Sequence, residues 1–488
     1  MSPSANELVG PLWKAMDVLR TNAAIDHYSA AGYVFRLLVL KLLSDMTEEP
    51  ATSVPLRFEV PTSARWSWLR HLSHLHLGVH INEACAALEQ DNPSLRGLLR
   101  QVDFASVEMS DGIVEDLFRA LSELPHLSGD LLSNGTLGEV ADGLLSWLAE
   151  SSGKKYGDLY TPTSVARLLA ELLDPQEGMS VCDPVCGAGG LLVECVRHAT
   201  SRSAMSLPHA AASLALHGQE KNAQRWAMCR MNLLLHGIID AQIEHRNALW
   251  SPPVEQESLL KYDRVLANPP WALSDWGADR AAEDTFGRFD PVPPRNNSDY
   301  AYVQHCLATL KEGGKAALLL PRGVLLRTGI EGLIRRKLLE EDQVEAVIGL
   351  PGGVLYGIGI PPVILALTKG KPAERRNRVL FIDASAAGVK QGRMLRVLSQ
   401  DNIGFIVRAF RDFGGDPRYV RVASLDEIRA LNWNLTIERY VKREEEREHF
   451  ELGEHLDTLA AVEKQRDEAA QRMDDAVSSL KRFYRPKF

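Results

Sequence analysis

The sequence predicts an α/β protein, in which a mostly parallel sheet follows an N-terminal helical domain and precedes a long C-terminal helix. Three observations predict the sheet. A short strand, a glycine-rich loop and a helix occupy residues 179–198, a second strand over 214–220 ends in an acid, and a further strand over 262–267 ends in Asn-Pro-Pro-Trp. Strand, glycine-rich loop and helix form the first unit of a nucleotide-cofactor fold. Ligands of such sheets bind at the carboxyl edge of the strands.

The composition is that of a large globular protein. The chain has 488 residues, 45% of them hydrophobic and 24% charged, which is enough for two or three domains. No apolar run approaches membrane length, and residues 1–7 carry no signal-peptide pattern. Six cysteines do not form a disulfide framework, and Cys182 and Cys186 have no second Cys/His pair at metal-ligand spacing. We therefore expect a cytoplasmic protein with no bound metal and no role for a membrane.

The charge balance is acidic. The formal net charge is −9 at pH 7 and the sequence pI is about 5.9. A protein that holds a nucleic-acid duplex alone usually carries a basic face. Local basic patches are compatible with a net acidic total, but the balance favours a partner that supplies much of any phosphate contact.

Residues 1–150 are expected to form a helical domain. Segments 12–20, 33–43, 111–124 and 137–148 carry apolar residues at helical spacing. The segment 33–43 is apolar enough for a buried core helix. No residue pattern for chemistry is evident here, so we expect this domain to serve packing or a partner.

The junction at 151–157 opens a second domain, predicted over residues 151–398. In the stretch that follows, Thr161 or Thr163 can cap the helix over 165–173, with Pro162 near its first turn. The loop before that helix offers free backbone N–H groups and an aromatic ring, Tyr160. Taken alone, this is an ordinary capped helix.

The glycine-rich loop follows Asp183, which ends the first strand. Its glycines let the backbone approach a ligand closely, and an acid at the strand end suits a cationic or hydroxyl-bearing ligand better than a phosphate. The spacing is not G-x-G-x-x-G and no Lys-Ser/Thr follows, so a dinucleotide or a P-loop fits less well. Glu220, at the end of the second strand, is placed for ribose hydroxyls. Asn247, after a third strand, is placed for an adenine ring edge.

The Asn-Pro-Pro-Trp tetrapeptide at residues 268–271 ends its strand because neither proline offers an N–H and each disfavours helix in the residue before it. The Asn268 amide and the next carbonyl are therefore held at the sheet edge, beside the flat ring of Trp271. Two oxygens and a stacking ring suit a planar, amine-bearing ring. A plain proline-punctuated turn is the alternative for the tetrapeptide alone. The loop over 271–297 is expected to grip substrate or to act as a lid.

The rest of the chain continues an alternating α/β pattern and then becomes helical and charged. Further strands are predicted over 315–320, 344–350, 363–369 and 379–383, and residues 399–488 are expected to form a helical region and partner-binding tail. From residue 459 apolar residues alternate by three and four, which predicts a long helix that pairs with another helix. The alternative is a helix folded back on its own domain.

Together these motifs resemble the modification subunits of type I restriction–modification systems, a class of amino-DNA methyltransferases. The stretch 158–163, the Asp-Pro-Val-Cys-Gly-Ala-Gly-Gly run over 183–190, the Gln-Glu pair at 219–220 and the tetrapeptide occur in the family's order. Residues 298–305, 313–317, 320–325 and 356–361 also look like the family, and the resemblance covers most of 10–370. The combination is specific, although each motif alone is not.

The resemblance implies a Rossmann-like S-adenosylmethionine-dependent methyltransferase sheet that methylates N6 of adenine at specific DNA sites. It implies these donor-binding residues: Asp158, Leu159, Tyr160, Thr161, Pro162, Thr163, Asp183, Gly187, Ala188, Gly189, Gly190, Glu220 and Asn247. Three positions depart from the family. Val185 stands where Ala is frequent, Asn247 where Asp is usual, which puts its adenine contact in question, and Trp271 where Phe or Tyr is more frequent.

The implied catalytic residues are Asn268, Pro269, Pro270 and Trp271. The N6 lone pair of adenine is delocalised into the ring, so the amine is a poor nucleophile. If the Asn268 side-chain oxygen and the Pro269 carbonyl accept both amine hydrogens, a pyramidal nitrogen is favoured and its lone pair can meet the sulfonium methyl in line. The target base must leave the duplex, and Trp271 would stack on it once flipped.

The implied partners are double-stranded DNA, a DNA-specificity subunit and, in many systems, a restriction/translocase subunit, with two copies of the modification subunit per complex.

Two other functions compete with this interpretation. A protein glutamine methyltransferase shares an Asn-Pro-Pro-aromatic tetrapeptide, because a side-chain amide presents a similar NH2. A non-catalytic DNA-sensing or assembly subunit could retain a relic methyltransferase fold. A solitary adenine methyltransferase, or one of another phage-defence system, is a further possibility within the preferred class.

Overall fold

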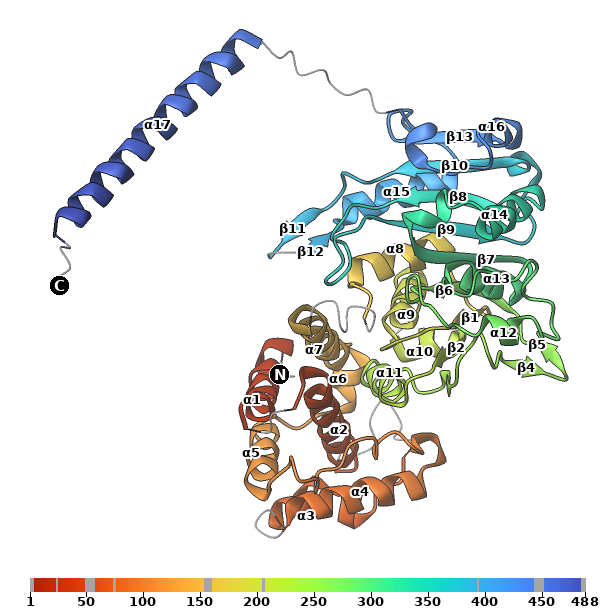
Figure 1. Cartoon of the computed structure of the whole chain (residues 1–488). Coiled ribbons are helices and arrows are strands. Elements are labelled where there is room, and N and C mark those ends of the chain that lie inside the picture. Colours follow the sequence, from red (N-terminus) through yellow and green to blue (C-terminus); the bar gives the residue numbers. More distant parts are fainter. Residues whose placement is uncertain are drawn as a thin grey trace. The chain divides into compact units, whose positions relative to one another are not determined.

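The computed structural model of the chain describes residues 4–22, 25–48, 58–72, 76–152, 160–203, 207–392, 395–442 and 452–483. The chain divides into two compact units, Met1–Val441 and Lys442–Phe488. The first unit contains a group of helices and a large sheet (Figure 1). Among the described residues, no helix is both long and apolar enough to span a bilayer.

The N-terminal part of the first unit is helical, as predicted. It contains α1 (Ala5–Asn22), α2 (His27–Met46), α3 (Trp66–His71), α4 (Leu77–Asp91), α5 (Asp111–Ser122), α6 (Gly129–Ser133) and α7 (Thr136–Ser152), with the short 3-10 turns η1 (Thr62–Ala64) and η2 (Pro93–Leu95). Helix α2 is buried along nearly all its length, which confirms the predicted core helix. Asp26 caps its first turn by accepting from the N–H groups of Tyr28 and Ser29.

The sheet has nine strands in the order β13-β10-β8-β9-β7-β6-β1-β2-β3. Their bounds are β1 (Ser180–Asp183), β2 (Ala215–Glu220), β3 (Gln242–His245), β6 (Tyr262–Ala267), β7 (Leu310–Pro321), β8 (Val344–Gly349), β9 (Pro362–Thr368), β10 (Arg378–Asp383) and β13 (Val420–Ser424). Strands β3, β2, β1, β6 and β7 run parallel, and β9 is antiparallel to both of its neighbours, β7 and β8. This confirms the predicted α/β class with a mostly parallel sheet. Two small ribbons lie outside it, β4 (Val254–Glu255) with β5 (Ser258–Leu259) and β11 (Val389–Gln391) with β12 (Leu395–Val397).

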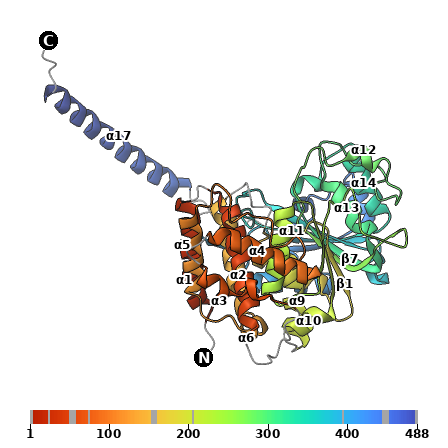
Figure 2. The same ribbon diagram turned by 90° about the horizontal axis from the view of Figure 1, so that it is seen from below.

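Helices cover both faces of the sheet (Figures 1 and 2). One set contains α8 (Thr163–Leu173), α9 (Gly190–Ser203), α11 (Ala223–Leu235) and α15 (Gln400–Asp412), and the other contains α13 (Asp299–Ala308) and α14 (Ile330–Glu340). Short helices α10 (Leu207–Ser213), α12 (Ala278–Ala281) and α16 (Leu425–Ala430) and the 3-10 turns η4 (Arg322–Leu325), η5 (Ala373–Arg375) and η6 (Ile437–Arg439) complete this part.

Successive strand residues point to opposite faces and therefore enter two separate cores. In β6, Leu266 packs in one core, whereas Val265 and Ala267 pack in the other. The core that contains Leu266 continues without a break into the N-terminal helices, where α11 packs against α2 and α7. The helical part and one face of the sheet thus share a single hydrophobic core.

The segment after residue 398 differs from its prediction as a helical region. Strand β13 pairs antiparallel with β10 at the edge of the sheet, and the first compact unit extends to Val441. The strand β13 is not evident from the sequence, because only Val420 and Ala423 of its residues are buried and no run of apolar residues marks it. Helix α17 (Leu452–Phe483) belongs to the second unit, where apolar residues such as Val462 and Met473 are exposed. Pairing of this helix with another helix stays a prediction.

Candidate active site

Three polar side chains come together at the carboxyl edge of neighbouring strands. Asp183 ends β1, Glu220 ends β2 and Asn268 directly follows β6, and β1 lies between the other two strands in the sheet. A cavity of about 320 Å³ opens beside this edge. Four of the predicted site residues line it, namely Glu220, Asn247, Asn268 and Pro270. The structure thus brings the second strand's acid and the start of the tetrapeptide to one cavity.

Asp183 and Glu220 are buried at this edge, and neither forms an ion pair within 4.0 Å among the described residues, although Arg225 and Lys221 act on Glu220 by charge. Asp183 is 1% exposed. Its Oδ1 accepts from the Val185 N–H at 3.0 Å, while Oδ2 has no hydrogen-bond partner among the described residues. Burial, with the nearby charge of Glu220, raises the pKa of Asp183 to about 8. Burial also raises the pKa of Glu220, which accepts from the Asn222 N–H at 2.7 Å. Such a pair favours a ligand that is cationic or rich in hydroxyl donors.

Residues with no role predicted from the sequence form much of the remaining cavity wall. They include the cationic Lys221, Arg225 and Arg246 and the buried ring of Tyr302. Arg225 lies in the first turn of α11, directly after the strand that ends in Glu220. The position of a basic residue just after such an acid is the signal that could have identified it.

The glycine-rich loop is shaped by close packing. Gly187 and Gly189 have φ values of +53° and +85°, which favour glycine. A Cβ atom on Gly189 would lie 2.9 Å from Cys229 Sγ, and one on Gly190 would lie 2.9 Å from Tyr160 Cε2. The Ala188 carbonyl accepts from Asn232 Nδ2 at 2.8 Å. The loop is therefore held between α11 and Tyr160, so its small residues are required by packing whatever the ligand.

The predicted donor loop before α8 reaches the tetrapeptide. Asp158 and Leu159 lie outside the described residues. Thr161 Oγ1 accepts from Asn268 Nδ2 at 3.1 Å. Helix α8 begins at Thr163 after Pro162, and its N-terminus has no side-chain cap, so the prediction that Thr161 or Thr163 caps it is wrong. The Thr161 hydroxyl serves instead to orient the Asn268 amide.

Tyr160 does not line the cavity. Its ring is buried against Gly190, and its hydroxyl donates to Asp142 Oδ1 at 2.9 Å. Asp142 belongs to α7, in the part of the chain where the sequence indicates no chemistry. Tyr160 therefore supports the glycine-rich loop from behind.

Asp142 is the centre of a polar network that joins the helical part to the sheet. Arg197 Nη2 on α9 donates to Asp142 Oδ2 at 2.7 Å, and His236 Nε2 at the end of α11 lies 3.3 Å from Oδ1. Burial alone would raise the pKa of Asp142, but the hydrogen bonds and charges of His236 and Arg197 outweigh it and hold the pKa at about 2. No sequence signal identifies this residue, because its partners are distant along the chain.

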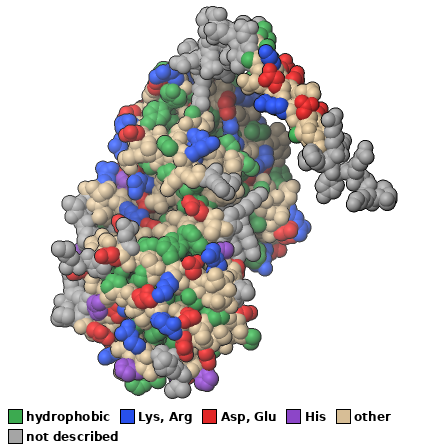
Figure 3. Space-filling model, turned by 90° about the vertical axis from the view of Figure 1, so that its left-hand side faces the viewer, with side chains coloured by type: hydrophobic (Ala, Val, Ile, Leu, Met, Phe, Trp, Pro, Cys, Tyr) green, Lys and Arg blue, Asp and Glu red, His purple; other side chains and the backbone are tan. Residues whose placement is uncertain are grey.

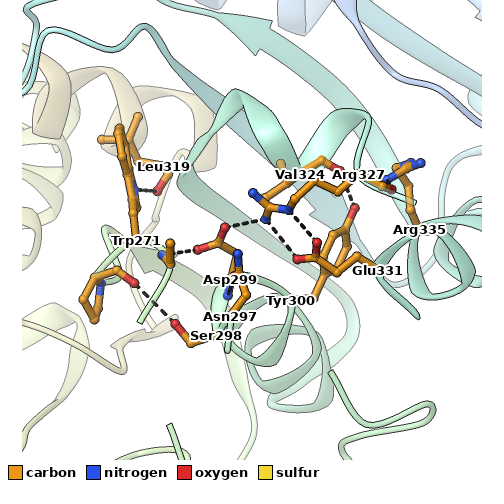
Figure 4. A network of polar contacts seen from close by, with 12 residues as sticks. Trp271, Asn297, Ser298, Asp299, Tyr300, Leu319, Val324, Arg327, Glu331 and Arg335 are labelled. Atoms are coloured by element: carbon orange, nitrogen blue, oxygen red, sulfur yellow. Dashed lines mark hydrogen bonds and ion pairs between the residues drawn. The ribbon is translucent and has the colours of Figure 1, made fainter. Parts of the chain in front are cut away.

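The tetrapeptide is bonded at both ends. Asn268 Nδ2 donates to Thr161 Oγ1, and no described residue donates to Asn268 Oδ1. Trp271 Nε1 donates to the Leu319 carbonyl of β7 at 3.1 Å, and the next N–H, that of Ala272, donates to Asp299 (Figure 4). The Trp271 ring is half-buried and does not line the 320 Å³ cavity. The tetrapeptide thus has Asn268 and Pro270 on that cavity and an aromatic ring outside it.

The loop over 271–297 is fastened to the rest of the unit at several points, and its expected role in gripping substrate or as a lid stays a prediction. Trp276 is buried and donates to the Pro294 carbonyl at 2.9 Å. Arg288 is also buried; it donates to the carbonyls of Ala248 at 3.0 Å and Leu249 at 2.9 Å and is ion-paired with Asp284 at 2.7 Å. These bonds fasten the segment to the chain directly after Asn247.

Known protein families match most of the chain. The family described as N-6 DNA Methylase matches residues 132–449, and the HsdM N-terminal domain matches residues 8–121. The type I restriction enzyme HindI methylase subunit of Haemophilus influenzae is 31% identical over 439 residues, which cover 83% of this chain and 95% of that protein. The MjaVII methylase subunit of Methanocaldococcus jannaschii is 31% identical over 385 residues, 76% of this chain.

The chain spans 63% of the length of the MjaVII subunit and 56% of that of the MjaVIII subunit from the same organism. Among solved structures, the methyltransferase subunit of a type I restriction-modification system from Streptococcus thermophilus matches with a TM-score of 0.79 at 25% identity, over 90% of this chain and 100% of that one. Fold, motif order and family match agree, and the chain belongs to the N-6 DNA methylase family.

Proposed function

We propose that this protein transfers a methyl group from S-adenosylmethionine to N6 of a flipped adenine in DNA, as the modification subunit of a type I restriction–modification complex. The observation that carries the proposal is the setting of Asn268. Its amide nitrogen is held by Thr161, its Oδ1 has no protein donor among the described residues, and it borders a cavity beside two buried carboxylates.

The residues of the cavity suit this donor. The donor is a cation with ribose hydroxyls, and it supplies an electrophilic methyl group on sulfur. Glu220 lines the cavity and suits the hydroxyls. Asp183 does not line the cavity but directly precedes Pro184, which does, and its buried oxygen that lacks a hydrogen-bond partner among the described residues suits the positive end. Asn247 lines the same cavity, but its Oδ1 already accepts from the Leu249 N–H at 3.0 Å, so its side-chain nitrogen is the group left for an adenine edge. A cavity of about 320 Å³ lies within the range usual for small-molecule sites.

The tetrapeptide provides the acceptors for the amine. Asn268 Oδ1 and the Pro269 carbonyl would each accept one N6 hydrogen, which draws electron density to nitrogen and favours the pyramidal geometry that exposes the lone pair. Thr161 fixes which end of the amide faces the amine. This help is positional and electrostatic, so it requires acceptors that are already in place before the reaction. The half-buried ring of Trp271 supplies the stacking surface for a base outside the duplex.

DNA binding is proposed to require partners. On the face shown in Figure 3, acidic and basic side chains are interspersed, and the net charge of the chain is −9. The relatives are named methylase subunits of type I restriction enzymes, which are multi-subunit systems. A DNA-specificity subunit would supply the target sequence and part of the phosphate contact. We propose two copies of this chain per complex, and a restriction/translocase subunit where one is encoded nearby.

The test is modification-sensitive sequencing of DNA from cells that express this gene with its genomic neighbours, beside the Asn268→Ala variant. We expect N6-methyladenine in one defined motif, and a loss of about 100- to 1,000-fold in transfer for the variant, because an acceptor that acts in the transition state is removed. Calorimetry should show donor affinity of the variant within about twofold of wild type, since donor binding does not depend on that acceptor. DNA methylation at wild-type level in Asn268→Ala would contradict the proposal, and methylated glutamine in a cellular protein without DNA methylation would favour a protein substrate.

A further inference from the structure

We propose that Asp299 is a positioning residue for methyl transfer: together with Arg327 and Glu331, it sets the backbone of residues 268–272 and thereby the place of Asn268. The inference rests on the proposed function of the tetrapeptide. It concerns residues that touch neither the cavity nor, in the proposed mechanism, the base.

The turn that follows Trp271 adopts a conformation that needs support. Ala272 has a φ of +49°, a left-handed conformation that is sparsely populated for residues other than glycine, and it is exposed to solvent. Its N–H donates to Asp299 Oδ1 at 2.9 Å (Figure 4). Only one residue separates that N–H from Pro270, which lines the cavity. A bond at this point therefore controls how the tetrapeptide leaves the sheet.

Asp299 is itself held by charge. Its side chain is 0% exposed, and its second oxygen accepts from Arg327 Nη2 at 2.5 Å. Arg327 continues to Glu331 through contacts of 2.5 Å from Nε and 3.0 Å from Nη2. A carboxylate this deeply buried must be paired, because loss of its partner leaves an uncompensated charge. Figure 4 shows Arg327 between the two carboxylates.

The network is anchored in the second core of the sheet, the one that contains Val265 and Ala267. Arg335 Nη1 donates to the Arg327 carbonyl at 2.9 Å and to the Val324 carbonyl at 3.1 Å, while the Tyr300 hydroxyl donates to the same Val324 carbonyl at 2.7 Å. Helix α13, turn η4 and helix α14 are thus tied together beneath the tetrapeptide. The rigid elements of that face determine where Asp299 holds the turn.

Two variants separate the two tasks of Asp299. Asp299→Asn keeps an oxygen for the Ala272 N–H but loses the ion pair with Arg327, whereas Asp299→Ala loses both. We expect the single-turnover rate at saturating donor and DNA to fall about 10-fold for Asn and about 100-fold for Ala, since a misplacement of about 1 Å can cost about 100-fold. The donor dissociation constant should stay within about twofold. The assay uses the full chain purified with its specificity subunit on unmethylated genomic DNA.

A matched control is Glu345→Gln. Glu345 is also a fully buried carboxylate, paired with Arg375 at 2.7 Å and Lys315 at 3.3 Å, but it lies on β8 and does not contact the tetrapeptide. We expect it to lower thermal stability about as much as Asp299→Asn while its transfer rate stays within about twofold of wild type. A further variant, Arg327→Lys, keeps the positive charge and covers the case in which Asp299→Ala fails to fold. It should lose less rate than Asp299→Asn.

Three results would overturn the inference. These are a wild-type rate in both Asp299 variants, an equal loss of rate in Glu345→Gln, or a loss confined to donor affinity. If the wild-type complex binds donor yet transfers no methyl to DNA, the proposed function fails and the inference with it. That failure is recognisable because it does not depend on any substitution.

Discussion

Two carboxylates, the partly buried Asp142 and the fully buried Asp299, hold different parts of the same site. Each accepts from an arginine and from a second donor. Asp142 joins the N-terminal helices to the glycine-rich loop through Tyr160, whereas Asp299 joins α13 and α14 to the turn after the tetrapeptide. The partners of Asp142 lie 18, 55 and 94 residues away, and those of Asp299 lie 27 and 28 residues away. The N-terminal helices therefore support the glycine-rich loop of the proposed donor site. Helices α13 and α14 support the tetrapeptide that is proposed to hold the adenine.

The largest effect that distinguishes the two networks is expected from Asp142→Ala. This change leaves Arg197 and His236 without their shared carboxylate at the junction, which should cost on the order of 3 kcal/mol of unfolding free energy. Donor affinity should fall at least about tenfold, by the loss of support for Tyr160, while the rate at saturating donor stays within about twofold. Urea unfolding, calorimetry and single-turnover kinetics measure the three quantities. A rate loss as large as that of Asp299→Ala would remove the contrast between the two carboxylates.

The second expected effect is a dependence of donor affinity on pH, which arises from Asp183 alone. The pKa of Asp183 is raised to about 8, so its carboxyl is largely protonated at pH 7 in the donor-free protein, and its contribution to stability is full below about pH 4 and is lost as pH rises through 8. A cationic donor favours the ionised form. Its affinity should therefore increase about tenfold between pH 7 and pH 9, since one pKa unit corresponds to a factor of ten.

Calorimetric titration of wild type and Asp183→Asn across this pH range checks the prediction. The variant should show no such slope, and a wild-type affinity that is flat or falls with pH would contradict it. Asp299→Asn serves as the contrast, because a change in the turn should leave the slope of wild type intact.

The smallest effect is expected from Tyr160→Phe, which removes one hydrogen bond to Asp142 and keeps the ring against Gly190. The loss should be about 1 kcal/mol of unfolding free energy, with donor affinity lowered a few-fold. Thermal melts and donor titration are the measurements. A loss of affinity as large as that of Asp142→Ala, without a loss of stability, would mean that the hydroxyl contacts the donor directly.

Local chemistry made part of the site predictable. Two prolines end β6 wherever it lies in the fold, and an acid at each of two strand ends reaches the same edge because neighbouring strands are parallel. The residues that could not be predicted have partners that are far away in the sequence. Asp142 looks like any polar residue of an amphipathic helix until α9 and α11 are packed against it. The Thr161 hydroxyl looks like a helix cap until the tetrapeptide lies beside it.

The hydrophobic core shared between the N-terminal helices and the sheet has a consequence for biosynthesis. Helices α2 and α7 pack against α11, which leaves the ribosome about 80 residues after the end of α7. At about 5–20 residues per second, the first helices wait roughly 4–16 s with an uncovered apolar face. We expect nascent chains stalled before residue 223 to bind chaperones and to be protease-sensitive, and chains that include α11 to become resistant. The region at the start of the chain would then complete its fold only when a later helix arrives.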